Sequence, residues 1–185
     1  MPPILVCLNL QRRHTNQTSR HYVPRAPHVL PAIVACLGWA RRRRLTIVHV
    51  HSGDIEGSDC LPIAGCEPKP SEILLFKRGR SFFDHAEFGL HGALRGRRAI
   101  VIGFTSGSDC IAAAHDAGRH GAGVLFVEDA ISSNVIAGHS PQAVDDILSA
   151  VLSEFANLTR LDELLAHELS PIDRPRQLIG HLLGE

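Results

Sequence analysis

Residues 99–130 constrain the fold more than any other stretch, because they read as a strand, a turn, a helix and a second strand in direct succession. An apolar run covers 99–104, small and polar residues follow at 105–109, a helical pattern covers 111–120, and a second apolar run covers 124–127. Short apolar runs of this kind are typical of strands buried on both faces of a parallel sheet. The segment therefore predicts two parallel strands joined by a crossover helix.

The same alternation extends over the rest of the chain. Further strands are expected at residues 4–8, 45–50, 73–76 and 155–158, and further helices at 31–40, 88–94, 141–152 and 160–167. We predict an α/β protein with a three-layer α/β/α arrangement, built on a central, mainly parallel sheet of five or six strands. Residues 1–185 are expected to form one domain, whose C-terminal tail, 169–185, would pack at an oligomer interface.

Charge and composition narrow the functional classes. The 19 basic and 19 acidic residues cancel, which gives no general basis for binding nucleic acid or an anionic membrane. No apolar run is long enough to span a bilayer and no secretory signal is visible, so a cytoplasmic protein is expected. The five cysteines are odd in number and form no CxxC pair, which disfavours both a zinc ribbon and a disulfide framework.

Cys110 falls where the turn at 105–109 becomes a helix. Unpaired backbone N–H groups and the helix dipole favour negative charge there, so a thiol should lose its proton more easily than usual. The same N–H groups could hold the oxyanion of an acyl intermediate. Cys110 is therefore either a nucleophile or a small buried residue that fills the seam between helix and sheet.

Ligands of parallel α/β sheets bind at the carboxyl ends of the strands. This rule selects four segments, at residues 9–11, 49–54, 77–83 and 105–110. Candidate site residues are expected in all four.

Four motifs in these regions resemble those of the isochorismatase-like cysteine hydrolases. They are ILVCLNLQ at the start, PSE…FKRGRSFF at 70–83, GFTSGSDC at 103–110 and HDAGRHGAGVLFVEDAISS at 115–133. The resemblance implies a three-layer α/β fold and a homo-oligomer, either a dimer or a tetramer. For amide-cleaving members it also implies an Asp–Lys–Cys triad and a non-proline cis peptide bond just before the cysteine.

The resemblance assigns roles to individual residues. Cys110 matches the nucleophile and Lys77 matches the triad lysine. The cis bond would join Thr105 and Ser106, and the N–H groups of Ser106 and Cys110 would form the oxyanion hole. Phe83 matches the aromatic side chain that lines the substrate pocket.

The third member of the triad departs from the family pattern. Asn9 stands where the family has aspartate, in a motif in which Gln11 is retained. An amide cannot accept a thiol proton, so the general-base step is in doubt. Either another group acts as the base, with His49, His51 and Asp109 as candidates, or the chain binds a ligand without turnover.

His49 and His51 lie two residues apart on one predicted strand and therefore share a face. With Asp54 they form a weak candidate for a divalent metal site, as in the nicotinamidase branch of the family. Pocket lining, or a polar layer under the 52–71 loop, is the preferred interpretation, and we expect no metal or other cofactor. The arginines at positions 12, 13, 78 and 80 would favour a carboxylate-bearing substrate.

These residues predict a hydrolase that cleaves an amide or carbamoyl C–N bond of a small molecule through a thioester on Cys110. Isochorismate-type cleavage is disfavoured, because protonation of the vinyl ether needs the acid that Asn9 cannot supply. The alternative is a catalytically impaired member of the family that binds a small metabolite or a partner without turnover.

Overall fold

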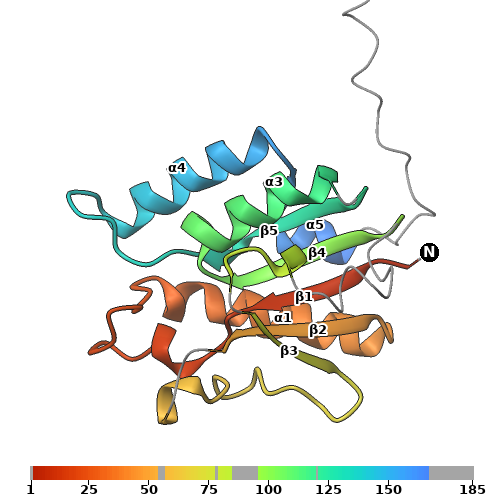
Figure 1. The fold of residues 1–185 in the computed structure, drawn as a ribbon, viewed down its shortest axis with the longest axis horizontal. Helices are drawn as coiled ribbons and strands as arrows, with labels where there is room; N and C mark the ends of the chain where they lie inside the picture. The colour runs from red at the N-terminus through yellow and green to blue at the C-terminus, as the bar shows by residue number, and fades with distance from the viewer. Residues whose placement is uncertain (1, 54–56, 78, 85–95, 120, 167–185) are drawn as a thin grey trace, which may run out of the picture.

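A six-stranded sheet organises the chain. The computed structural model describes residues 2–53, 57–77, 79–84, 96–119 and 121–166 (Figure 1). The strand order is β3-β2-β1-β4-β5-β6, and every pairing is parallel. The strands are β1 (Ile4–Leu8), β2 (Thr46–Ser52), β3 (Ile73–Lys77), β4 (Arg98–Phe104), β5 (Gly123–Ser132) and β6 (Asn157–Thr159). The predicted α/β class is confirmed, and the sheet has six strands, within the predicted five or six.

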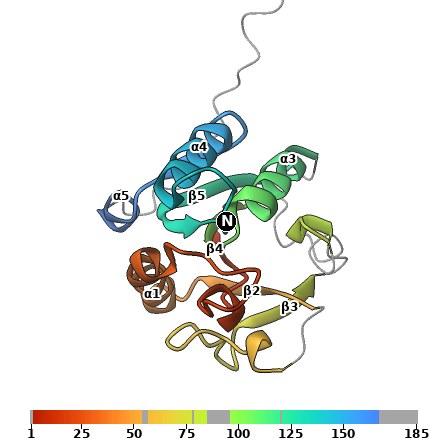
Figure 2. The ribbon, with the colours of Figure 1, turned by 90° about the vertical axis from the view of Figure 1, so that its left-hand side faces the viewer.

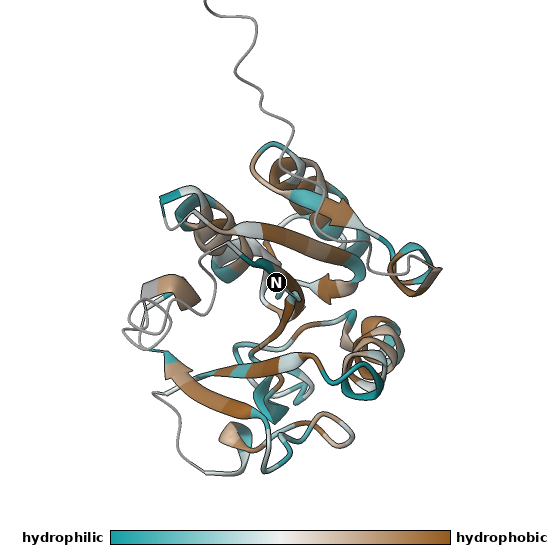
Figure 3. Ribbon diagram, turned by 90° about the vertical axis from the view of Figure 1, so that its right-hand side faces the viewer, coloured by the Kyte–Doolittle hydropathy of each residue, from teal (hydrophilic) through white to brown (hydrophobic). Residues whose placement is uncertain are grey.

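Helices cover both faces of the sheet and create two apolar cores. They are α1 (Ala26–Arg42), α3 (Ile111–Arg119), α4 (Pro141–Ser153) and α5 (Leu161–Ala166). One core joins the sheet to α3 and α4, and the other joins it to α1 and α5. Figure 2 shows α1 and α3 on opposite sides of the strands. Figure 3 shows these strands as hydrophobic for most of their length, as expected for strands covered on both faces.

Some boundaries differ from the predicted ones. Helix α1 begins at Ala26, five residues before the predicted start at 31, because Pro27 takes the first-turn position that suits proline. Pro31 lies inside the helix, which gives up one backbone hydrogen bond there. Strand β5 continues to Ser132, beyond the predicted end at 127. The predicted 88–94 helix and the 169–185 tail lie outside the described residues.

Gly103 allows β1 and β4 to approach closely at their carboxyl ends. Its φ is 116°, and a Cβ at this position would lie 2.1 Å from the carbonyl oxygen of Leu8. Only glycine tolerates this combination of backbone angle and contact. The residues that follow the two strands, Asn9 and Thr105, therefore emerge side by side. Among the described residues, no helix is long and apolar enough to cross a membrane.

Candidate functional site

A polar cleft opens at the carboxyl ends of the strands, where the topology places a ligand site. Its volume is about 610 Å³. It is lined by residues at the ends of five strands, including Asn9, Ser52, Lys77, Thr105, Asp109 and Ser133. Two of the three predicted triad positions, Asn9 and Lys77, are therefore together in one cleft.

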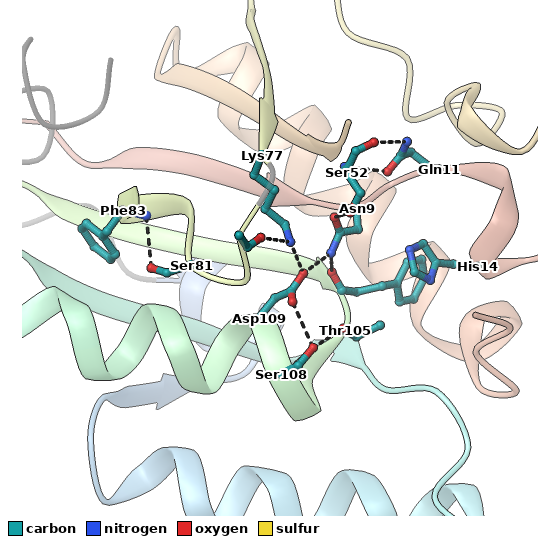
Figure 4. Close-up of polar contacts among 12 residues, drawn as sticks. Asn9, Gln11, His14, Ser52, Lys77, Ser81, Phe83, Thr105, Ser108 and Asp109 are labelled. Atoms are coloured by element: carbon teal, nitrogen blue, oxygen red, sulfur yellow. Dashed lines mark hydrogen bonds and ion pairs between the residues drawn. The ribbon is translucent and has the colours of Figure 1, made fainter. Parts of the chain in front are cut away.

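The residue that joins Asn9 and Lys77 is Asp109 (Figure 4). The ammonium nitrogen of Lys77 lies 2.7 Å from Oδ2 of Asp109, and Nδ2 of Asn9 donates to the same oxygen at 2.5 Å. All three side chains are at least nine-tenths buried. An ion pair this well shielded from water is stronger than one on the surface. The centre of the site is thus Asn–Lys–Asp.

Three hydrogen-bonding groups around Asn9 fix the orientation of its side-chain amide. Nδ2 also donates to the carbonyl oxygen of Phe104 at 2.6 Å, so both of its hydrogens point at acceptors. On the other side, Oδ1 of Asn9 accepts a hydrogen bond from Ser52 Oγ at 3.1 Å. Asn9 has a φ of 51°, a left-handed conformation that asparagine tolerates better than most residues. The site is therefore built for an amide at position 9.

Among the described residues, the partners of Asp109 and Lys77 leave one hydrogen-bond acceptor site on Asp109 and one donor hydrogen on Lys77 unused. The carboxylate has about four acceptor positions. Lys77 and Asn9 occupy both on Oδ2, and Ser108 Oγ donates to Oδ1 at 2.9 Å. The ammonium has three hydrogens, which donate to Asp109 and to the carbonyl oxygen of Gly79 and leave one over. One acceptor site of Asp109 and one hydrogen of Lys77 thus have no partner among the described residues.

Cys110 is not among the described residues that line this cleft, and its predicted role as the nucleophile stays a prediction. Its side chain is 0% exposed and packs in the apolar core between the sheet and α3. Burial and the adjacent charge of Asp109 raise the pKa of the Cys110 thiol well above its usual value, and the Lys77 charge only partly opposes them. This direction is opposite to the lowered pKa that the helix N-terminus predicts. The interpretation of Cys110 as a buried residue in the seam agrees with its position.

The turn before α3 also differs from expectation. A non-proline cis peptide bond is present, but it joins Phe104 and Thr105, one residue earlier than predicted. Residues Ser106–Cys110 form a π-helical turn. Within it, the Gly107 N–H donates to Ser133 Oγ at 3.3 Å, and the Asp109 N–H donates to the Thr105 carbonyl at 3.1 Å. The proposed oxyanion role of the Ser106 and Cys110 N–H groups stays a prediction.

Two predicted pocket residues have structural positions instead. Gln11 is buried and bridges two segments, accepting the Ser52 N–H at 3.0 Å and donating to the Ser52 and Cys60 carbonyls at 3.3 Å. Phe83 stacks on Phe82 with ring centroids 4.5 Å apart and packs in the α3-side core. Neither is among the described residues that line the cleft.

His49 and His51 face α1, away from the cleft, because strand alternation places them on that side. Nε2 of His49 lies 2.9 Å from Oε2 of Glu72. Arg41 donates to Oε1 of Glu72 at 2.7 Å and to Oε2 at 3.0 Å. Burial lowers the pKa of His49 and lowers that of His51 to about 4. Of the two interpretations of His49 and His51, the polar layer under the 52–71 loop agrees with these contacts. Asp54 lies outside the described residues, within which no group of three ligands could hold a metal.

Glu72→Gln is expected to lower the free energy of unfolding by about 1–2 kcal/mol at pH 7, since the partly exposed Arg41 would lose its ion pair. Burial alone would raise the pKa of Glu72, but hydrogen bonds from Arg41, the Lys69 N–H and His49 lower it to about 2. A depressed folded-state pKa stabilises the protein above the unfolded value of 4.5, and this stability is lost as pH falls toward 2. Denaturant unfolding should show the difference shrinking over that range. Equal loss in the exposed control Glu154→Gln would contradict this.

Other residues of the cleft were not identified from the sequence. Ser52 ends β2, while His14, Arg20 and His21 belong to the loop after β1, which has no periodic pattern. Of the arginines singled out, Arg13 and Arg80 line the cleft. Arg12 points elsewhere, with its Nε donating to the Pro62 carbonyl at 3.2 Å, and residue 78 lies outside the described residues. If the whole loop after β1 had been treated as part of the ligand site, as the rule for parallel sheets allows, these residues would have been candidates.

Comparisons with known proteins identify the fold. No protein-family model matches the sequence, and no curated protein matches it either. Solved structures do match. An isochorismatase from Pseudomonas putida KT2440 has a TM-score of 0.76 and 22% identity, covering 88% of this chain and 89% of its own. A cysteine hydrolase from Pseudomonas syringae pv. phaseolicola 1448A has a TM-score of 0.72 and 17% identity, covering 89% and 90%.

A third structural match is described differently. The MAR1 ribonuclease from Caenorhabditis elegans has a TM-score of 0.72 and 13% identity, covering 89% of this chain and 79% of its own. The chain thus has the fold of isochorismatase-like hydrolases, as the resemblance implied. Because the same fold also occurs in a protein described as a ribonuclease, the function must be argued from the site.

Proposed function

We propose that the protein is a hydrolase of small molecules that cleaves an amide or carbamoyl C–N bond with water as the nucleophile. The observation that carries this proposal is the buried ion pair of Lys77 and Asp109 in the cleft, with a separation of 2.7 Å. A carboxylate with one unused acceptor can bind and orient a water molecule. The ammonium beside it can donate a proton to a leaving nitrogen.

The proposed reaction keeps protons in balance without a covalent intermediate. Asp109 takes a proton from water, and the hydroxide forms a bond to the carbonyl carbon. Lys77 then donates a proton to the leaving nitrogen as the C–N bond breaks. The proton on Asp109 returns to the Lys77 amine, which lies against the same carboxyl group. One water is consumed, and an acid and an amine or ammonia are released.

Asn9 acts in this scheme as a positioning residue. Its amide donates to Asp109 and is itself held by Ser52 through the 3.1 Å hydrogen bond. The Ser108 hydroxyl donates to the other carboxylate oxygen. Asp109 is therefore held in one orientation before a substrate enters, which lowers the cost of reaching the reactive geometry.

A second candidate function is ligand binding without turnover. Its support is that the residue replacing the family aspartate is an amide and that Cys110 is absent from the lining of the cleft. A chain that has lost both groups could keep the cleft and its ligand while losing the chemistry. The predicted homo-oligomer is compatible with either function.

The test compares native protein, Cys110→Ala and Asp109→Asn for release of ammonia from small amides and carbamoyl compounds. Turnover by the native protein should persist within about threefold in Cys110→Ala and fall at least about 100-fold in Asp109→Asn. Loss of turnover in a folded Cys110→Ala would restore the cysteine mechanism and exclude ours. Binding of panel compounds, measured by calorimetry, with none consumed would favour the second candidate.

A further inference from the structure

The charges that line the cleft are unbalanced. Its described lining holds four basic side chains and one carboxylate, that of Asp109; the basic residues are Arg13, Arg20, Lys77 and Arg80. Over the whole chain the basic and acidic residues cancel. Basic residues are thus concentrated in this cleft, and such a cleft attracts anions.

The inner part of the cleft uses its cations internally. Lys77 is paired with Asp109. Arg13 donates to Ser52 Oγ at 2.8 Å and to Nε2 of His14 at 3.2 Å. Burial and the charge of Arg13 lower the pKa of His14 to about 3, so this ring is a neutral acceptor at pH 7. Arg13 is therefore held in place as part of the wall.

Arg20 and Arg80 are the two exposed arginines of the described lining. Both are exposed, and they reach the cleft from different segments, one after β1 and one after β3. Within the described chain, neither has a carboxylate within ion-pair distance. By contrast, Arg25 pairs with Asp145 at 3.2 Å and Arg41 with Glu72 at 2.7 Å. Nε of Arg20 donates to Nε2 of His21 at 3.1 Å, and both guanidinium groups are exposed at the outer end of the cleft.

We infer that the cleft binds a small organic anion, whose carboxylate or phosphate group is held by Arg20 and Arg80 while its neutral end reaches Asp109 and Lys77. Guanidinium groups bind both kinds of anion through paired N–H donors. A volume of about 610 Å³ suits a small molecule. This inference rests on the proposed function for the position of the scissile bond, because it names the substrate class as an amide that carries an anionic group at its far end.

Binding is tested without any need for turnover. Succinamate, succinate, inorganic phosphate and the neutral succinamide are titrated into the native protein by calorimetry. Succinamate and at least one of the other two anions should bind more tightly than succinamide, and the affinity should fall as salt rises. Tighter binding of succinate or of phosphate decides between a carboxylate and a phosphate ligand. Equal binding of succinamide, or no binding of any anion up to millimolar concentration, would overturn the inference.

Variants assign the effect to the two arginines. Arg20→Ala and Arg80→Ala should each weaken anion binding by about fivefold to tenfold. The matched control is Arg119→Ala, on the far end of α3, whose side chain is 75% exposed. Unchanged affinity in both cleft variants would also overturn the inference. Anion binding without turnover would support the anion site and contradict the proposed hydrolase. Turnover of neutral amides without anion binding would support the hydrolase and contradict the anion site.

Discussion

Asn9→Asp is expected to lower the free energy of unfolding by about 2–4 kcal/mol at pH 7, although it restores the aspartate that the family resemblance implies. The amide of Asn9 donates to the Phe104 carbonyl and to Asp109, and a carboxylate in its place would set an oxygen against both acceptors. Two buried carboxylates would then compete for Lys77. No cysteine chemistry should appear, because Cys110 lies in the core.

The pH dependence of Asn9→Asp has a definite sign. Two facing carboxylates favour a shared proton, so the folded variant should bind more protons than its unfolded chain near pH 5–7. Its deficit against the native protein should therefore shrink as pH falls from about 7 toward the unfolded aspartate pKa of about 4. Denaturant unfolding at several pH values measures this. The matched control, Asn157→Asp at an exposed position of β6, should change stability little at any pH.

The exchange variant Asn9→Asp/Asp109→Asn tests the same contact from both sides. It keeps one carboxylate and one amide in the pair, so it should recover much of the stability lost by Asn9→Asp alone. If Asn9→Asp were as stable as the native protein and gained turnover that Cys110→Ala removed, the site would be a cysteine hydrolase after all.

The sequence predicted the sheet well because its information is local. Each strand is a short apolar run, and the rule that ligands bind at the carboxyl ends of parallel strands selected the segments holding Asn9, Lys77 and Asp109. It could not decide which face of β2 meets the cleft, since that strand is buried on both sides. His49 and His51 were therefore assigned to the pocket, whereas Ser52 lines it.

The burial of Cys110 could not be predicted from the sequence for a different physical reason. In a helical turn, neighbouring side chains point in directions about 100° apart. An error of one residue in the expected position therefore replaces a side chain that faces the cleft with one that faces the core. The turn Ser106–Cys110 is π-helical, which the sequence does not signal. Motif matching placed the reactive group on the cysteine because of its chemistry. The contacts place Asp109 beside Lys77 and leave Cys110 behind it.

Lys77→Met is expected to have the largest combined effect, with a loss of about 3 kcal/mol in stability and of at least about 1,000-fold in any turnover. The Asp109 side chain is only 8% exposed, so removal of its cation leaves a buried charge without a counterion. Under the proposed reaction it also removes the acid that protonates the leaving nitrogen. Lys69→Met, at an exposed position, should change neither quantity appreciably.

A double-mutant cycle separates the ion pair from other effects of the methionine. Lys77→Met/Asp109→Asn removes both charges, and it should be more stable than Lys77→Met alone because no buried charge is left over. Stability follows from denaturant unfolding and turnover from the same amide panel. A coupling energy below about 0.5 kcal/mol would mean that the two charges do not stabilise each other. The carboxylate would then be held by Asn9 and Ser108 alone, and Lys77 would lose its place in the proposed reaction.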